Sequence, residues 1–131
     1  MKEENGSLVS APSYDCCGGL GICKPGFVAI NSIDCERHYV PRFTELFRSR
    51  AHAIDTMLGF LSMVVLEPKA EGEPFLVVSY WKDEESFQAW TGSDEFREGH
   101  KRAFEDLRLA KRRGEKPMMH SSFSTYTVLA E

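Results

Sequence analysis

Three side chains differ in chemistry from the apolar residues around them. Asn31 is an amide in an otherwise apolar strand face, His100 lies in the apolar stripe of a helix, and Trp90 ends a short predicted helix. An imidazole in an apolar cavity can bind a metal, a buried amide needs a hydrogen-bond partner, and an indole offers a flat wall. Together the three residues indicate a pocket for a flat, apolar ligand with a metal at its centre.

Each of the three residues also has an ordinary structural explanation. An amide near a strand end often satisfies a loop, a tryptophan most often belongs to the core, and a histidine in an apolar stripe is commonly a hydrogen-bonded core residue. The functional interpretation therefore depends on the three side chains meeting in one cavity. The other histidines lack such a setting and show no mutual spacing that would make a chelate: His38, His52 and His120.

The sequence carries none of the strong motifs of other enzyme classes. It has no phosphate-binding loop, no dinucleotide fingerprint, no serine-histidine-aspartate nucleophile pattern and no His-Glu-x-x-His zinc helix. Since neither a flavin nor a nicotinamide site is indicated, electrons for a redox reaction would have to come from outside the chain.

The elements that must position these residues follow from hydrophobic periodicity. Alternation and β-branched residues predict strands, whereas apolar residues three and four positions apart predict helices. The predicted elements are a strand over 27–33, a helix over 39–55, strands over 58–66 and 75–81, a short helix after Asp83, a long helix that includes Phe96 to Ala110, and a strand over 122–129. Their order is β-α-β-β-α-α-β.

This order predicts a ferredoxin-like α+β domain, in which helices cover one face of a four-stranded antiparallel sheet. In that arrangement Asn31 faces the helices from the sheet, while Trp90 and His100 face the sheet from the helices. The cavity between them is expected to be walled by four aromatic residues: Phe27, Phe87, Phe96 and Phe104.

Two of the predicted strands are apolar on both faces. Nearly every position of 58–66 and of 75–81 is apolar, yet a single layer of helices covers only one face of a sheet. An exposed apolar sheet face is an aggregation hazard, which a second identical sheet packed against it removes. We therefore expect a homodimer in which the two sheets form a shared α/β barrel.

Length and charge exclude several other functions. The 131 residues allow one compact domain with a short appendage. The net charge of −4, from 16 basic and 20 acidic residues, argues against a nucleic-acid partner, because such partners require a basic surplus. The longest nearly unbroken apolar run, Met57 to Leu66, is shorter than the roughly 20 residues that a membrane span needs.

Residues 1–26 differ in composition from the rest of the chain. They are rich in Gly, Ser, Cys and Pro without periodicity, which predicts an irregular arm before a domain over 27–131. The crowding of Cys16, Cys17 and Cys23 favours reduced thiols over a disulfide framework, with a metal site as the alternative. Reduced thiols and the lack of a secretory signal predict a cytoplasmic protein, or one in an organelle such as a plastid if a targeting sequence was removed.

Three segments of the sequence carry a family resemblance. The run FVAIN at 27–31, and the later segments FLVVSYWK at 75–82 and SFQAWTGSDEFREGH at 86–100, resemble the iron-regulated surface determinant G-like haem-degrading monooxygenases. These enzymes belong to the antibiotic-biosynthesis-monooxygenase superfamily of dimeric ferredoxin-like domains. The resemblance extends from about Phe27 to the C-terminus, and its most specific part is Trp81 to His100.

The resemblance implies an active site and a reaction. The family's Asn, Trp and His match Asn31, Trp90 and His100, with His100 Nε2 as the proximal ligand of haem iron and the four aromatic wall residues in contact with haem. Trp90 then distorts the porphyrin, and Asn31 donates a hydrogen bond on the open haem face.

Haem in this family is both substrate and oxygen-activating cofactor. The resemblance implies that O2 is consumed, that an external reductant or reductase supplies electrons, and that the ring opens and iron is released. The net charge of +4 over residues 101–116 suits haem propionates or an acidic reductase.

Two other functions stay open on the sequence. The first is a cofactor-independent quinol or polyketide monooxygenase of the same superfamily, which would take an aromatic substrate into the pocket without haem. The second is a non-enzymatic haem carrier, in which the cysteine arm takes part in delivery or redox sensing.

Overall fold

The fold follows the predicted order of elements. The structure is a computed structural model that describes residues 24–50 and 52–131. The predicted arm over 1–26, with Cys16, Cys17 and Cys23, lies outside the described residues except for residues 24–26. The observed elements are β1 (Phe27–Cys35), η1 (Arg37–Tyr39), α1 (Val40–Arg48), η2 (Ala53–Thr56), β2 (Phe60–Leu66), β3 (Phe75–Trp81), α2 (Glu84–Thr91), α3 (Asp94–Arg112) and β4 (Met119–Thr127).

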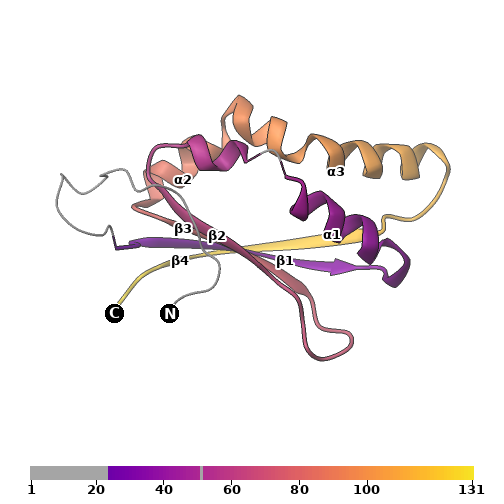
Figure 1. The fold of residues 1–131 in the computed structure, drawn as a ribbon, viewed down its shortest axis with the longest axis horizontal. Coiled ribbons are helices and arrows are strands. Elements are labelled where there is room, and N and C mark those ends of the chain that lie inside the picture. The colour runs from indigo at the N-terminus through magenta and orange to yellow at the C-terminus, as the bar shows by residue number, and fades with distance from the viewer. Residues whose placement is uncertain (1–23, 51) are drawn as a thin grey trace.

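The four strands form one antiparallel sheet in the order β2-β3-β1-β4. Helices α1, α2 and α3 lie over the same face of this sheet, and none of the described helices lies on the other face (Figure 1). The predicted ferredoxin-like α+β class is therefore confirmed. Among the described residues, no helix combines the length and the apolar character that crossing a bilayer requires.

Alternate residues of β1 face the helices. Phe27, Ala29 and Ile33 are buried there, and Asn31 lies in the same row. The buried residues divide into two clusters, one around Phe27 and Trp90 and the other around Ile33 and Phe43. The space between these clusters, beneath the helices, is where the fold leaves room for a cavity.

Helix α1 is shorter than predicted, because it ends at Arg48 rather than near residue 55. The Ser49 hydroxyl donates a hydrogen bond back to the Glu45 carbonyl at 2.7 Å, and the backbone then leaves the helix. His52 adopts a left-handed conformation with φ of 61° before the short helix η2 begins. Ile54 in η2 is nevertheless buried. The three- and four-residue spacing of apolar residues therefore continues from α1 into η2, which is why it did not reveal that the helix ends between them.

Strand β2 contains an irregularity that alternation alone does not predict. Its register with β3 shifts between Phe60 and Ser62. A bulge of this kind moves the following residues to the opposite face. Phe60 and Met63 consequently both pack against the core cluster on the helix-covered side, although they are three residues apart.

Side-chain caps define where α2 and α3 begin. Asp83 accepts hydrogen bonds from the backbone nitrogen of Ser86 at 2.9 Å and from its hydroxyl at 2.6 Å, and Ser93 accepts one from the nitrogen of Phe96 at 3.0 Å. Ser86 also packs against Gly59, whose φ of 85° favours glycine and where an added Cβ would lie 2.0 Å from the Ser86 hydroxyl. The α2 cap therefore also holds the start of β2.

The Asp83 cap predicts a pH-dependent contribution to stability. The hydrogen bonds from the Ser86 side chain and backbone lower the pKa of Asp83. A lowered pKa in the folded state adds stability that is present above the unfolded value of about 3.9 and is lost as pH falls through the folded value. We expect Asp83→Ala to reduce the free energy of unfolding by about 1 kcal/mol near neutral pH.

Urea unfolding at a series of pH values measures this effect. The difference in the free energy of unfolding between wild type and Asp83→Ala should shrink below about pH 4, which is near the unfolded pKa. The reason is that the protonated carboxyl is a weaker hydrogen-bond acceptor. The matched control is Glu85→Ala, which also removes a first-turn carboxylate from α2 but no cap. A difference that stays constant on acidification would contradict the role of the ionised cap.

Candidate functional site

A cavity of about 510 Å³ lies between the helices and the sheet. Sites for small molecules typically measure about 300–1,000 Å³, so this volume suits an organic ligand. Its lining comes from β1, α1, η2, α2 and α3, with further residues from the other strands, and includes members of both core clusters. The cavity therefore interrupts what would otherwise be one continuous core.

Helix α3 presents aromatic rings to the cavity at four-residue intervals. The ring centroids of Phe96 and His100 are 4.1 Å apart, and those of His100 and Phe104 are 5.4 Å apart. Trp90 on α2 approaches the same group, with its centroid 5.3 Å from that of Phe96. All four rings line the cavity, so the imidazole is part of an aromatic wall.

The hydrogen bond of His100 determines its tautomer. Its Nδ1 atom lies 2.7 Å from the carbonyl oxygen of Phe96. A carbonyl only accepts, so Nδ1 carries the proton and Nε2 of the neutral ring keeps a free lone pair. A backbone contact of this kind is the usual way in which a metal-binding imidazole is oriented. In this tautomer Nε2 is the ring nitrogen that has a lone pair available for a partner.

Asn31 contributes an unmet hydrogen-bonding group from the sheet side of the cavity. Its Oδ1 atom is buried and has no hydrogen-bond partner among the described residues. The neighbouring polar residue Ser79, which also lines the cavity, accepts a hydrogen bond from Trp81 Nε1 at 2.9 Å. A buried polar atom without a partner costs about 1–3 kcal/mol, and such atoms mark places where a ligand completes the bonding.

Gly99 makes room for Trp90. Trp90 is buried, and a Cβ added at Gly99 would lie 3.4 Å from its Cη2 atom. Glycine inside a helix costs roughly 1 kcal/mol relative to alanine. The sequence analysis did not single out Gly99. A glycine inside an amphipathic helix, next to His100, can indicate a close packing contact.

Six of the seven predicted site residues line one cavity. They are Asn31, Phe87, Trp90, Phe96, His100 and Phe104. Phe27 is placed elsewhere, because it lies at the start of β1 and packs behind Phe87 with ring centroids 5.4 Å apart. Phe27 therefore supports the wall and does not form part of it.

Three residues that the sequence analysis did not assign to the site also line the cavity, among them His52, which it had set aside. They are Arg50, His52 and Arg102, and no Asp or Glu of the described residues joins them. Asp55 binds the first two from outside the lining, at 3.0 Å from Arg50 Nη1 and 3.0 Å from His52 Nδ1. Asp55 therefore offsets the charge of Arg50, whereas Arg102 donates to a hydroxyl and to carbonyls, which carry no formal charge. Arg50 and His52 fell within the predicted long helix, whose break brings them to the cavity.

Comparison with protein families gives a match over the part of the chain that forms the site. The family model described as antibiotic biosynthesis monooxygenase matches residues 26–102. This segment includes Asn31, Trp90 and His100.

Two curated relatives are named haem oxygenases. A mycobilin-producing haem oxygenase of Mycobacterium tuberculosis is 38% identical over 63 residues, which cover 48% of this chain and 60% of the relative. A staphylobilin-producing haem oxygenase of Staphylococcus haemolyticus is 30% identical over 76 residues, which cover 56% of this chain and 72% of the relative. The chain thus spans about 60% of the length of the M. tuberculosis relative.

A solved structure extends the similarity over most of the fold. The haem-degrader MhuD from M. tuberculosis, with two haems bound in its active site, is similar with a TM-score of 0.57 and 28% identity. The similarity covers 80% of this chain and 97% of that chain.

The unmet amide predicts that the ligand-free protein gains stability when Asn31 is made apolar. We expect Asn31→Leu to raise the free energy of unfolding by about 1 kcal/mol, because it removes an unsatisfied buried acceptor. The matched variant Ser79→Ala should lower it by about 1 kcal/mol, because it leaves the Trp81 indole without its acceptor. Urea unfolding measures both values, and a clear loss of stability in Asn31→Leu would show that the amide is already satisfied.

Proposed function

The chain belongs to the antibiotic biosynthesis monooxygenase family, and we propose that it is a haem-degrading monooxygenase that binds haem in the cavity beneath α3. The observation that carries the proposal is His100, whose Nε2 atom is left free by the bond to Phe96 and whose ring lines the same cavity as the unmet amide of Asn31. The names of the two haem oxygenases and of the haem-bound MhuD support it.

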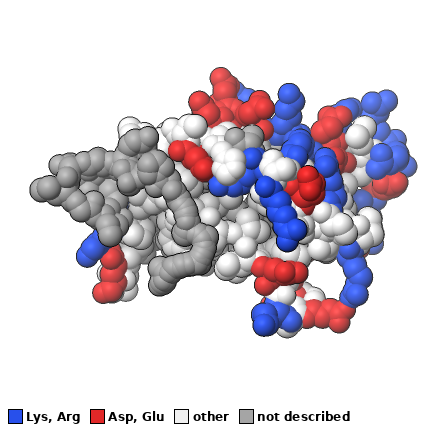
Figure 2. Space-filling model, in the orientation of Figure 1, with Lys and Arg blue, Asp and Glu red and all other residues white. Residues whose placement is uncertain are grey.

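The lining of the cavity fits a porphyrin. The rings of Phe87, Phe96 and Phe104 offer flat apolar surface, which suits a planar macrocycle. The guanidinium of Arg50, which also pairs with Asp55, lines the cavity and is a cation that carboxylate groups such as propionates would meet. On the face that Figure 2 shows, basic and acidic side chains are interleaved around the C-terminal end of α3.

The chain's residues take separate roles in this proposal. His100 holds iron through Nε2 while the Phe96 carbonyl keeps the imidazole oriented. Trp90, which has room beside Gly99, would contact the bound ligand from α2. Asn31 presents its amide from the sheet, and an amide can donate or accept according to the partner that it meets.

The reaction needs groups from outside the chain. Bound haem supplies both the iron that activates oxygen and the ring that is opened, with O2 as co-substrate and an external reductant as the source of electrons.

Haemin titration followed by reduction in air tests this function. Purified protein is expected to give a Soret band with haemin, and ascorbate or a reductase under oxygen should bleach the band and release iron that a chelator captures. His100→Ala should abolish turnover, because it removes the only nitrogen that the proposal assigns to iron. The control His38→Ala removes an exposed imidazole of η1, outside the cavity, and should leave turnover unchanged.

Other outcomes of this experiment lead to other functions. A stable Soret band that survives reduction in air would identify a haem carrier. Failure to bind haemin better than an inert apolar surface would contradict the proposal and leave an oxygenase of an aromatic substrate that works without haem.

The uncovered face of the sheet supports a homodimer, which we propose as the functional unit. None of the described helices covers this face, and it carries Val64 and Leu66 of β2 and Tyr126 of β4. Leu66 and Tyr126 are 46% and 55% exposed. Packing against a second copy would remove this apolar surface from water.

Sedimentation equilibrium measures the predicted assembly. We expect twice the mass of one chain at micromolar concentration, and a shift toward the monomer in Leu66→Lys, which places a charge on the uncovered face. The matched control is Leu58→Lys, since Leu58 is 86% exposed and precedes β2. A wild-type protein that sediments as a monomer would contradict the dimer.

A further inference from the structure

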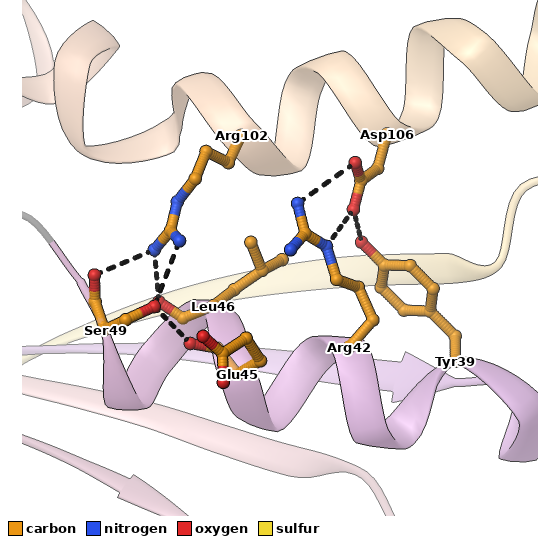
Figure 3. Close-up of polar contacts among 7 residues, drawn as sticks. All are labelled: Tyr39, Arg42, Glu45, Leu46, Ser49, Arg102 and Asp106. Carbon is orange, nitrogen blue, oxygen red and sulfur yellow. Dashed lines mark hydrogen bonds and ion pairs between the residues drawn. The ribbon is translucent and has the colours of Figure 1, made fainter.

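Two polar bridges connect α3 to the two ends of α1 (Figure 3). At the C-terminal end, Arg102 Nη1 donates to the Ser49 hydroxyl at 3.0 Å, and Nη2 donates to the carbonyls of Leu46 at 2.9 Å and Ser49 at 3.0 Å. At the N-terminal end, Asp106 accepts from the Tyr39 hydroxyl at 2.5 Å and from Arg42 Nε at 2.9 Å. The position of α1 relative to α3 is therefore held at both ends.

The Arg102 bridge uses groups that the helix itself cannot satisfy. The last carbonyls of an α-helix have no intrahelical donors, and a cation near a helix C-terminus interacts favourably with the helix dipole. A planar guanidinium serves several acceptors in fixed directions, which a lysine ammonium does not. Arg102 therefore holds the last turn of α1 in position, immediately before the helix ends at its C-cap, Ser49.

The Asp106 bridge joins a buried phenol, Tyr39, to a partly buried carboxylate and an exposed guanidinium, Arg42. Burial disfavours the ionised carboxylate of Asp106, yet hydrogen bonds from Arg42 and Tyr39 outweigh it and lower the pKa of Asp106. Burial and the bond to Asp106 raise the pKa of the Tyr39 phenol. This bridge stays ionised and intact at neutral pH, so both ends of α1 are held under the same conditions.

Only the first bridge belongs to the cavity. Arg102 lines it, together with Leu46 and Arg50 from α1 and the loop after it, whereas Asp106 is absent from the lining. Arg102 also follows His100 by two residues on α3. The hydrogen bonds of the guanidinium thus connect the cavity wall formed by α1 to the part of α3 that carries His100.

From this geometry we propose that Arg102 is a positioning residue, which sets the spacing between α1 and α3 and so holds the cavity at the width that retains haem. The proposal rests on the proposed function, because it assumes that haem occupies the cavity. Arg102 acts through α1 rather than by touching iron, since both terminal nitrogens of its guanidinium already donate to Ser49 and Leu46.

The test compares Arg102→Gln with Asp106→Asn, each of which breaks one bridge between the same two helices. For each full-length variant we would measure the rate of haemin loss to an excess of scavenger, the absorption spectrum of the ferric complex, and hydrogen exchange of the ligand-free protein. Arg102→Gln should lose haemin roughly tenfold faster, the factor for about one charge-assisted hydrogen bond, and should shift the spectrum. Asp106→Asn should lower stability while leaving both haem properties unchanged.

Hydrogen exchange locates the effect without haem. Arg102→Gln should speed exchange in the last turn of α1, and Asp106→Asn should speed it in the first turn. Arg102→Lys keeps the charge without the fork and should behave like Arg102→Gln; full recovery in this variant would show that charge alone is responsible and would overturn the positioning role.

The remaining outcomes separate this proposal from the proposed function. Wild-type haem loss and spectrum in Arg102→Gln, or equal changes in both bridge variants, would reduce Arg102 to a structural contact and overturn the proposal. A wild-type protein that binds no haemin would instead overturn the proposed function and with it the haem-retaining role, while hydrogen exchange would still report whether Arg102 holds α1.

Discussion

The aromatic stripe of α3 is the contact on which the rest of the site depends. Phe96, His100 and Phe104 recur at four-residue intervals, which places three rings on one side of the helix. Phe96 packs against the core cluster that contains Phe27 and Trp81, and Gly99 lets Trp90 lie close to α3. The volume that stays open is the cavity, and the tautomer of His100 follows from its bond within the same stripe.

The cavity divides the stabilising interactions of the domain into two groups. One cluster of buried residues surrounds Trp81, and the other surrounds Phe43, with the open volume and the unmet amide of Asn31 between them. Side chains are closely packed within both clusters, whereas the space between them contains an open cavity and a buried oxygen without a hydrogen-bond partner. Such features concentrate at functional sites, because a ligand can supply the missing contacts.

The helices around the cavity are held by contacts of different kinds. α2 and α3 begin at side-chain caps, and α1 is joined to α3 by Arg102 and Asp106. Caps act within a few residues of the chain, whereas the two bridges connect residues more than fifty positions apart. The shape of the site therefore depends on long side chains at the surface as well as on the apolar core.

The amino-acid sequence by itself determined the order of the four strands and three α-helices, the face of β1 that carries Asn31 and the stripe of α3 that carries His100, but not the short helices η1 and η2. These features follow from periods of two and of about 3.6 residues, which are properties of short stretches of chain. Only the tertiary structure decided that α1 ends at Arg48, that β2 contains a bulge and that Phe27 lies behind the cavity wall. It also brought Arg102 to carbonyls 53 and 56 positions earlier. Contacts of this kind depend on which distant residues meet after folding, and no local period of the sequence records that.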